Sequence, residues 1–352
     1  GQALHHANLA MILQTRGDID GALAVSRHAV ALAPELPSVR VNHAYLLLLC
    51  GDFANGFADY RRWYAGFEGA QTISGPEWQG DAFAGRTLVL FSEQGMGDAL
   101  QFIRYLPMVA AKGGTIVLNV QPALVPLLRG LEGVSVVPHG APLPPYDLQL
   151  SLMYLPAVFG TLLDSIPAEI PYLLADPEKV EAWQDALRDV AALKVGIIWA
   201  GNPAHKGDRL RSVSADAVLR ALVMPNVQLY SLQVGQRPAD SQVLAELGSA
   251  VIDLAPRLDN FADTAAAISA LDLVISVDTA TAHLAGALGC PIWVMLPYAK
   301  DWRWLRDRED SPWYPTMRLF RQRTPRQWSD VIVRLAAELA AVANTKAAGL
   351  GR

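Results

Sequence analysis

Two patterns of apolar residues divide the chain. Over residues 1–65, apolar and small residues recur at helical spacing, so only helices are expected there. Residues 66–85 are rich in glycine, show no periodicity and predict a connector. From residue 86 onward, short runs of Val, Ile and Leu alternate with amphipathic stretches, which is typical of parallel strands covered by helices. The sequence therefore predicts an all-α segment followed by α/β structure.

The apolar runs predict ten strands in two sets, within residues 86–176 and 177–325. The expected strands are 86–91, 115–120, 134–138 and 148–152 in the first set, and 194–200, 227–234, 250–255, 272–277, 291–296 and 317–322 in the second. The expected helices include 98–111, 121–131, 177–192 and a last helix at 326–345. Two such sets indicate two Rossmann-like doubly wound domains, which bind ligands at the carboxyl ends of their strands.

The helical segment contains an internal repeat. Gly17-Asp18 recurs 34 positions later as Gly51-Asp52, with small and apolar residues around both pairs. A 34-residue period of this kind is the signature of tetratricopeptide repeats, in which Gly-Asp would form the turn between two helices. Two repeats are too few to be stable alone, so we expect them to dock on the next domain or to belong to a longer array.

Composition narrows the possible functions. Just over half of the residues are hydrophobic and 18% are charged, which predicts a large core, and the net charge of −5 argues against a nucleic-acid-binding surface. Cys50 and Cys290 lie far apart and are expected to be free thiols in the cytoplasm. No stretch has the length of a membrane span and the start lacks a signal peptide, although the chain opens with Gly1 and targeting segments could be missing.

The strongest polar cluster is VDTATAH, residues 277–283. Asp278, Thr279, Thr281 and His283 follow an expected buried strand, at the start of a helix rich in Ala, Gly and Leu. The N–H groups of a helix start favour an anion, and the hydroxyls and imidazole add donors. Two alternatives remain open: one residue only caps the helix, or His283 is a core histidine.

A basic loop follows the first strand of the second set. His205, Lys206, Arg209 and Arg211 fall within seven residues, a local positive patch in an acidic chain that suits a diphosphate. The alternative is a solvated charged loop. The spacing is not that of a Walker loop, and neither a metal-ligand pattern nor a G-x-S-x-G elbow is present in the sequence.

The stretch FSEQGMGDALQF follows the first strand of the first set. Gln94, Gly95 and Gly97 predict a tight turn at the carboxyl end of that strand. Asp98 either caps the next helix or acts as a general base, and Glu93 is a second carboxylate in the same turn.

A further segment, residues 300–315, is rich in aromatic side chains, among them Trp302, Trp304 and Trp313. Packing is the favoured interpretation, and stacking on a sugar or base is the alternative.

Taken together, GMGD after the first strand, WAGNPAHKGDRLRS at the start of the second domain and VDTATAHLAGALGCP near the end resemble GT-B glycosyltransferases, most of all the heptosyltransferase-like family 9. Over about residues 5–345 the chain is similar to bacterial proteins that fuse tetratricopeptide repeats to such a domain. The resemblance implies an inverting transfer from a nucleotide-sugar without metal or cofactor. It also implies that the last helix packs back on the N-terminal α/β domain.

The resemblance assigns roles to single residues. Asp98 matches the general base, with Glu93 left as the alternative. The expected donor-side residues are Lys206 and Arg211 in the basic loop, Asp278, Thr279, Thr281 and His283 at the helix start, and Gln233 after the strand 227–234. Ala280 stands where the family has glycine. The nucleotide (UDP, GDP, ADP or CMP) stays open.

The partners follow from the helical repeats, which typically bind peptides, proteins or a second copy. An acceptor protein, as in O-glycosylation of flagellin, is one expectation, and a lipopolysaccharide or other glycan acceptor is the alternative. An inactive scaffold or peptide-binding protein is a second alternative. An NAD-type dehydrogenase is disfavoured because Leu100 occupies the third glycine position of the dinucleotide fingerprint.

Overall fold

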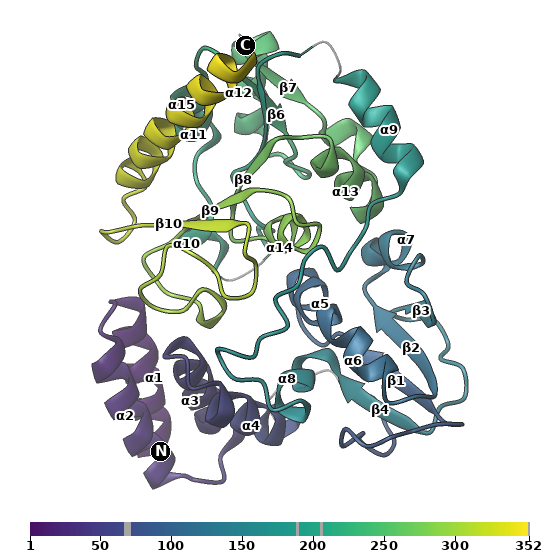
Figure 1. Ribbon diagram of the computed structural model, residues 1–352. Helices are drawn as coiled ribbons and strands as arrows, with labels where there is room; N and C mark the ends of the chain where they lie inside the picture. The colour runs from purple at the N-terminus through teal and green to yellow at the C-terminus, as the bar shows by residue number, and fades with distance from the viewer. Residues whose placement is uncertain (67–71, 188–189, 205–206, 351–352) are drawn as a thin grey trace. The chain divides into compact units, whose positions relative to one another are not determined.

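The computed structural model describes residues 1–66, 72–187, 190–204 and 207–350, in two compact units (Figure 1). The first unit comprises Gly1–Ala168 and Ala299–Arg308, and the second comprises Glu169–Tyr298 and Glu309–Arg352. The helical segment and the first sheet thus form one unit. The segment Ala299–Arg308 lies between two strands of the second unit in sequence but packs within the first, which the sequence did not predict.

The first unit opens with two helical hairpins. Their helices are α1 (Gln2–Thr15), α2 (Ile19–Leu32), α3 (Pro37–Leu49) and α4 (Phe53–Trp63), followed by the 3₁₀ turn η1 (Tyr64–Gly66). Gly17 and Gly51 both have φ 84°, and Asp18 and Asp52 each accept a hydrogen bond from the backbone N–H three residues on. The two Gly-Asp pairs therefore form equivalent helix-to-helix turns, as the repeat predicts.

A four-stranded parallel sheet follows, in the order β3-β2-β1-β4. Its strands are β1 (Thr87–Phe91), β2 (Thr115–Val120), β3 (Val134–Pro138) and β4 (Leu148–Ser151). The strand order reverses between β1 and β4. In open α/β sheets ligands bind beyond the carboxyl ends of the strands at such a switch point, and the turn after β1 lies there.

The helices between these strands are shorter than predicted. They are α5 (Met96–Phe102), η2 (Ile103–Tyr105), α6 (Leu106–Ala110), η3 (Pro122–Leu124), α7 (Val125–Leu128), η4 (Leu152–Tyr154) and α8 (Leu155–Val158). Continuous helices over 98–111 and 121–131 were therefore wrong. Pro107, Pro122 and Pro126 lie at the breaks, because proline lacks an N–H and restricts the residue before it.

The second unit holds a six-stranded parallel sheet in the order β10-β9-β8-β5-β6-β7, the doubly wound Rossmann order counted from β5. Its strands are β5 (Leu193–Ile198), β6 (Val227–Ser231), β7 (Val251–Asp253), β8 (Leu273–Val277), β9 (Ile292–Leu296) and β10 (Met317–Arg321). The switch point falls between β5 and β8, whose following loops are the two polar segments singled out from the sequence.

Helices cover both faces of this sheet (Figure 1). They are α9 (Pro177–Ala186), α10 (Asp208–Arg211), α11 (Ala215–Leu222), α12 (Pro238–Leu247), α13 (Phe261–Ser269), α14 (Ala280–Ala287) and α15 (Ser329–Leu350), with 3₁₀ turns η5 (Gly248–Ala250) and η6 (Ala255–Arg257). The remaining 3₁₀ turn, η7 (Trp302–Trp304), belongs to the first unit.

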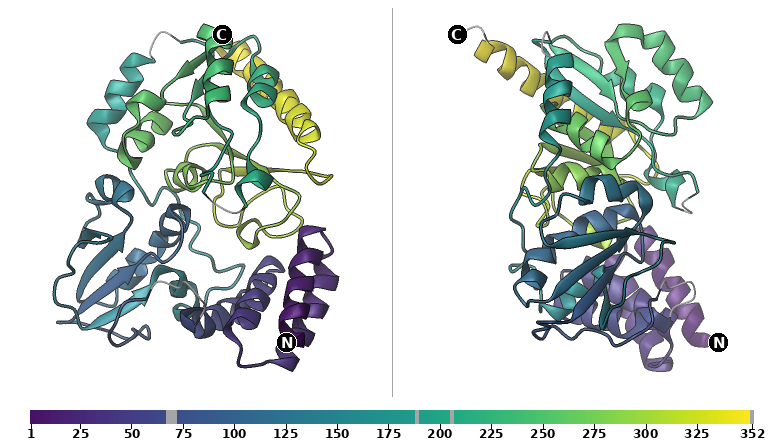
Figure 2. Two further views of the ribbon diagram at one scale, coloured as in Figure 1. Left: turned by 180° about the vertical axis from the view of Figure 1, so that it is seen from behind. Right: turned by 90° about the vertical axis from the view of Figure 1, so that its right-hand side faces the viewer.

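The last helix packs within the second unit, where α15 lies beside α11 (Figure 2). Its apolar side chains, including Val331, Leu335 and Leu339, lie in the core of the second unit with strands β5, β8 and β9. Lys346 Nζ also donates to Asp272 at 2.6 Å. These contacts lie within the second unit. The expectation that residues 326–345 also pack back on the N-terminal α/β domain stays a prediction.

Candidate functional site

The turn after β1, residues 92–98 (hereafter the β1 turn), brings two carboxylates to the switch point of the first sheet. Asp98 is the third residue of α5, and its Oδ2 accepts a hydrogen bond from the backbone N–H of Gly95 at 3.0 Å. The capping role weighed from the sequence is therefore real. It uses one carboxylate oxygen and leaves the other for a second partner.

The second partner of Asp98 is Arg303. Its guanidinium Nε donates to Asp98 Oδ1 at 2.9 Å, Nη2 donates to the same oxygen, and the Asp98 side chain is 14% exposed. Nη1 of Arg303 also donates to Asp301 at 3.1 Å, so the guanidinium lies between two carboxylates. Sequence reasoning missed this pair, because Arg303 lies 205 positions away in a tryptophan-rich run that was interpreted as packing.

The carboxyl group of Glu93 is largely buried. Its Oε1 accepts a hydrogen bond from the Tyr60 hydroxyl at 2.8 Å, and its Oε2 is buried. Burial raises the pKa of Glu93 to about 7, and hydrogen bonds from Tyr60 and Ser151 offset this only in part. Tyr60 belongs to α4, so a residue of the helical segment contacts the β1 turn directly.

The remaining residues of the β1 turn differ in role from the prediction. Gln94 donates from Nε2 to the hydroxyls of Tyr60 and Tyr45. Gly95 has φ −70°, which any residue adopts, and Gly97 lies inside α5. The chain does turn here, from β1 into α5, but neither Gly95 nor Gly97 has the positive φ that would require glycine. A side chain at Gly95 would first meet the Asp98 carboxylate, at 3.4 Å.

In the second unit, α14 begins directly after β8. Thr279 is its N-cap residue but makes no side-chain capping bond. Ser276 Oγ donates to the Val277 carbonyl at 2.7 Å, so its contact with Thr279 Oγ1 at 3.0 Å must take its proton from Thr279. The Thr279 hydroxyl is thus bonded to Ser276 and not to the N–H groups of the first turn, where Thr281 is half-buried. Those N–H groups have the polarity that binds an anion.

His283 is buried, at 4% exposure, and its Nδ1 pairs with the Tyr314 hydroxyl at 2.8 Å. Gly286 allows this pair, since a Cβ there would lie 2.4 Å from the Tyr314 ring. The core-histidine interpretation therefore accounts for one of the two ring nitrogens, Nδ1, which is bonded inside the protein. Tyr314 was seen in the sequence only as one aromatic residue among several.

The loop after β5 reaches the start of α14 through Arg211, whose Nη1 donates to the backbone carbonyl of Asp278 at 2.9 Å. Two of the four predicted basic residues, His205 and Lys206, lie outside the described residues. Asp208, buried and missed in the sequence, holds the loop by accepting from Ser212 Oγ at 2.9 Å.

Gln233 supports the end of β5. It is 5% exposed, its Oε1 accepts from the N–H groups of Trp199 at 3.1 Å and Ala200 at 2.9 Å, and its Nε2 donates to the Val234 carbonyl at 3.1 Å. Its amide is thus engaged with the protein backbone. We expected it to contact a nucleotide.

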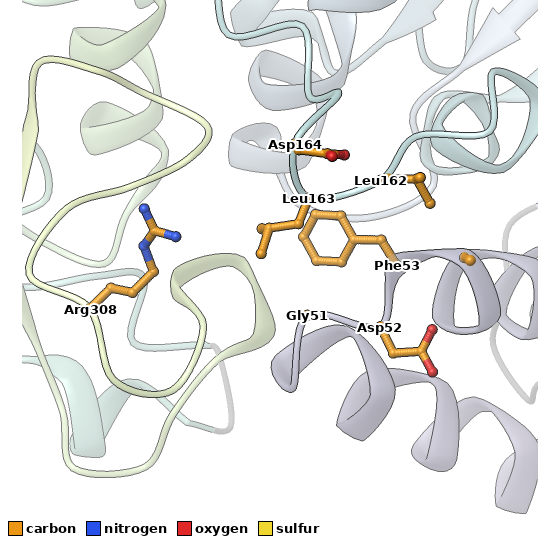
Figure 3. Close-up of a pocket in the computed structure, with 8 residues that line it drawn as sticks. Gly51, Asp52, Phe53, Leu162, Leu163, Asp164 and Arg308 are labelled. Atoms are coloured by element: carbon orange, nitrogen blue, oxygen red, sulfur yellow. The ribbon is translucent and has the colours of Figure 1, made fainter.

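A separate pocket of about 600 Å³ lies in the first unit (Figure 3). Phe53, Leu162 and Leu163 supply apolar walls, and Arg308 lies to the left of them and Asp164 above Leu163 in the view. The pocket contains Gly51 and Asp52 of the second repeat turn but none of the catalytic or donor-binding residues expected from the sequence.

Within the described ranges, no group of three or more His, Cys, Asp or Glu side chains could hold a metal ion. No helix of the described part of the chain is long and apolar enough to cross a bilayer.

Comparison with known proteins identifies the type of domain. Residues 226–294, which contain β6 to β8 and the whole of α14, match glycosyltransferase family 9 (heptosyltransferase). Protein FlbA of Caulobacter vibrioides is 31% identical over 356 residues, an alignment that covers 92% of this chain and 59% of FlbA. The chain thus spans about three fifths of that relative's length. The expectation of a glycosyltransferase is confirmed, and the match to family 9 lies in residues 226–294.

Two solved structures share the fold. The family 9 glycosyl transferase from Veillonella parvula superposes with a TM-score of 0.55 at 10% identity, covering 78% of this chain and 99% of that protein. The ADP-heptose lipopolysaccharide heptosyltransferase II of E. coli superposes with a TM-score of 0.53 at 13% identity, covering 74% and 99%. These matches support two Rossmann-like domains of GT-B type.

Proposed function

We propose that this protein is an inverting, metal-independent glycosyltransferase that moves a sugar from a nucleotide-sugar to a hydroxyl acceptor. The observation that carries the proposal is the start of α14. It lies at the switch point of a Rossmann-ordered sheet, its cap side chain does not use its N–H groups, and Arg211 is fixed beside it. The family 9 match includes this helix. A helix N-terminus with an adjacent arginine suits the diphosphate of a nucleotide-sugar.

The donor side would stabilise the charge that develops on the leaving diphosphate. The positive or hydrogen-bond-donating groups would come from four places. They are the N–H groups at the start of α14, the hydroxyl of Thr281, the guanidinium of Arg211 and Lys206. Gln233 and Asp208 would act indirectly, by holding the loops that carry these groups.

On the acceptor side, we propose Asp98 as the base. It lies at the end of the β1 turn, at the switch point of the first sheet, and its Oδ1 pairs with Arg303. Glu93 is the poorer candidate, because one of its oxygens is buried and the other accepts from Tyr60. Asp98 would remove the acceptor proton as the hydroxyl attacks the anomeric carbon opposite the leaving diphosphate.

The donor is tested by thermal unfolding with ADP, UDP, GDP and CMP, followed by ADP-heptose, the donor named for the E. coli structure. A nucleotide at one hundred times its Kd should add about 2.7 kcal/mol of stability. Arg211→Ala should weaken that binding by about 10- to 100-fold, as expected for one lost charge-assisted contact. Arg220→Ala, which removes a solvent-exposed pair on α11, is the matched control. Wild type that no nucleotide stabilises would contradict the proposal.

The base is tested separately. Asp98→Asn should abolish transfer while nucleotide binding stays unchanged, because the substitution removes a proton acceptor from the first unit only. Transfer at the wild-type rate by this variant would refute Asp98 as the base and return Glu93 to that role.

We further propose that the acceptor is a protein and that the helical segment, as a tetratricopeptide-type module, recruits it. Helix α1 supports this, since Leu9, Met11 and Ile12 are 43%, 50% and 53% exposed. Mass analysis of proteins incubated with enzyme and labelled donor would decide. A sugar found only on glycans would instead favour the lipopolysaccharide-type acceptor.

A further inference from the structure

One residue of the helical segment lies inside the hydrogen-bond network of the β1 turn. Tyr60 of α4 is fully buried, and its hydroxyl contacts both Glu93 and Gln94. Its ring stacks on Tyr64 with centroids 4.7 Å apart and meets the edge of Tyr154 at 6.0 Å. Burial raises the pKa of Tyr60 well above 10, so the hydroxyl keeps its proton throughout the neutral range.

The direction of each hydrogen bond around Tyr60 is fixed. The amide Nε2 of Gln94 can only donate, so it gives its protons to the hydroxyl oxygens of Tyr60 and Tyr45. The single proton of Tyr60 is then left for Glu93 Oε1, at 2.8 Å. Tyr60 is therefore an acceptor on one side and a donor on the other. Phenylalanine could fill the same space but could perform neither role.

The same logic extends the network across the ends of three strands. Gln121 Nε2 donates to the backbone carbonyl of Gln94 at 2.7 Å, which fixes the orientation of the Gln121 amide. Its Oε1 must then accept from Ser92 Oγ, at 3.0 Å. Because the Ser92 proton is used, the contact of Ser92 with His139 Nε2 at 3.2 Å needs a proton on the histidine.

The network ties the β1 turn to rigid elements on both sides. Ser92, Gln121 and His139 follow β1, β2 and β3, and on the other side Tyr60 anchors the turn to α4. The turn carries Asp98 at its end, so its backbone position decides where that carboxylate lies. A displacement of about 1 Å in such a group can cost on the order of 100-fold in rate.

We propose that Tyr60 is a positioning residue of the reaction: its hydroxyl fixes the β1 turn, and the helical segment is part of the acceptor-side machinery as well as a recruitment module. The inference rests on the proposed function for its catalytic meaning. The competing interpretation is that Tyr60 is only a core residue of the second helical hairpin. The two interpretations differ in one requirement. A positioning role needs the hydroxyl of Tyr60, whereas a core role needs only its ring.

The test is Tyr60→Phe, which keeps the ring in the α4 core. It should lower kcat by about 10-fold or more and leave the KM for the nucleotide-sugar unchanged. It should also raise the pKa of Glu93, because the hydrogen bond that holds it down is lost. Amide exchange in the peptide that covers the β1 turn should become faster. Tyr146→Phe, which removes an exposed hydroxyl bonded to the Ser74 carbonyl at 2.7 Å, is the matched control.

A second variant keeps the test open if Tyr60→Phe folds poorly. Fluorotyrosine at position 60 retains the hydroxyl and makes it more acidic, so it should donate more strongly and lower the pKa of Glu93. The proposal is overturned if both variants keep the wild-type kcat, the wild-type rate of amide exchange in the β1 turn and the wild-type pKa of Glu93. The exchange and titration readouts need no substrate, so they decide the role of Tyr60 even if the wild type transfers no sugar, an outcome that contradicts only the proposed function.

Discussion

Replacing Glu93 by glutamine tests the electrostatics of the β1 turn. Burial holds the pKa of Glu93 at about 7 in the folded chain, against 4.5 in an exposed glutamate. The groups that face it are Tyr60 and Ser151, which lower the pKa, and the carboxylate of Asp98, which raises it. Glutamine keeps the acceptor for the Tyr60 hydroxyl but cannot ionise.

The sign and size follow from proton linkage. Below pH 4.5, Glu93 is protonated in both folded and unfolded chains and carries no penalty. As the pH rises from 4.5 to about 7, the unfolded chain releases this proton first, so the folded state loses stability. A gap of about 2.5 pH units corresponds to about 3 kcal/mol at 1.36 kcal/mol per unit, with the loss complete above pH 7.

The assay is urea unfolding of wild type and Glu93→Gln at pH 5, 6, 7 and 8, followed by a probe in the first unit. The free energy of unfolding of the variant minus that of wild type should rise by about 2–3 kcal/mol over this range. Glu132→Gln, on an exposed glutamate of the same unit, should give a flat difference. If the difference in unfolding free energy for Glu93→Gln also stays constant with pH, burial of the ionised Glu93 carboxylate does not destabilise the fold, and the reasoning is refuted.

Three further changes test the packing and the ion pair. Gly286→Ala places a Cβ 2.4 Å from the Tyr314 ring and should lower the free energy of unfolding by about 1–3 kcal/mol in urea, whereas Gly130→Ala, with no atom within 4 Å of its Cβ, should not. Gln233→Leu leaves two buried N–H groups at the end of β5 without their acceptor and should cost about 1–3 kcal/mol each in the same assay, so a loss below about 0.5 kcal/mol would contradict this role. Arg303→Gln should slow transfer about tenfold or more with nucleotide binding unchanged, and a wild-type rate would show that the ion pair is dispensable.

The strands were predictable because burial on both faces leaves a strong local signal. All ten expected strands exist, and their ends differ by at most three residues from the expected ones, as for 227–234 against Val227–Ser231. The helices of the first α/β region were less predictable. Apolar spacing continues through Pro107 and Pro126, although each proline interrupts the hydrogen-bond ladder there.

The candidate site was predictable only where it is local. The start of α14 and the β1 turn each lie within one short stretch, next to a strand end that fixes their place. Arg303 and Tyr60 contact the β1 turn from 205 and 33 positions away, and nothing in a single sequence pairs them with Asp98 or Glu93. The backbone hydrogen bonds of the Gln233 amide could not be predicted from the sequence either, and its contact with a nucleotide stays a prediction.

The two polar segments at the switch points have opposite electrostatic character, and this difference is the physical basis for dividing the roles. The β1 turn presents two carboxyl groups, that of Asp98, which pairs with Arg303, and that of Glu93, whose pKa burial raises to about 7. The start of α14 presents N–H groups and Arg211, which favour negative charge. An acceptor hydroxyl must lose a proton, while a leaving diphosphate must gain a counter-charge. We therefore propose that the acceptor hydroxyl loses its proton at the first unit, and that the leaving diphosphate gains its counter-charge from Arg211 and the α14 N–H groups in the second.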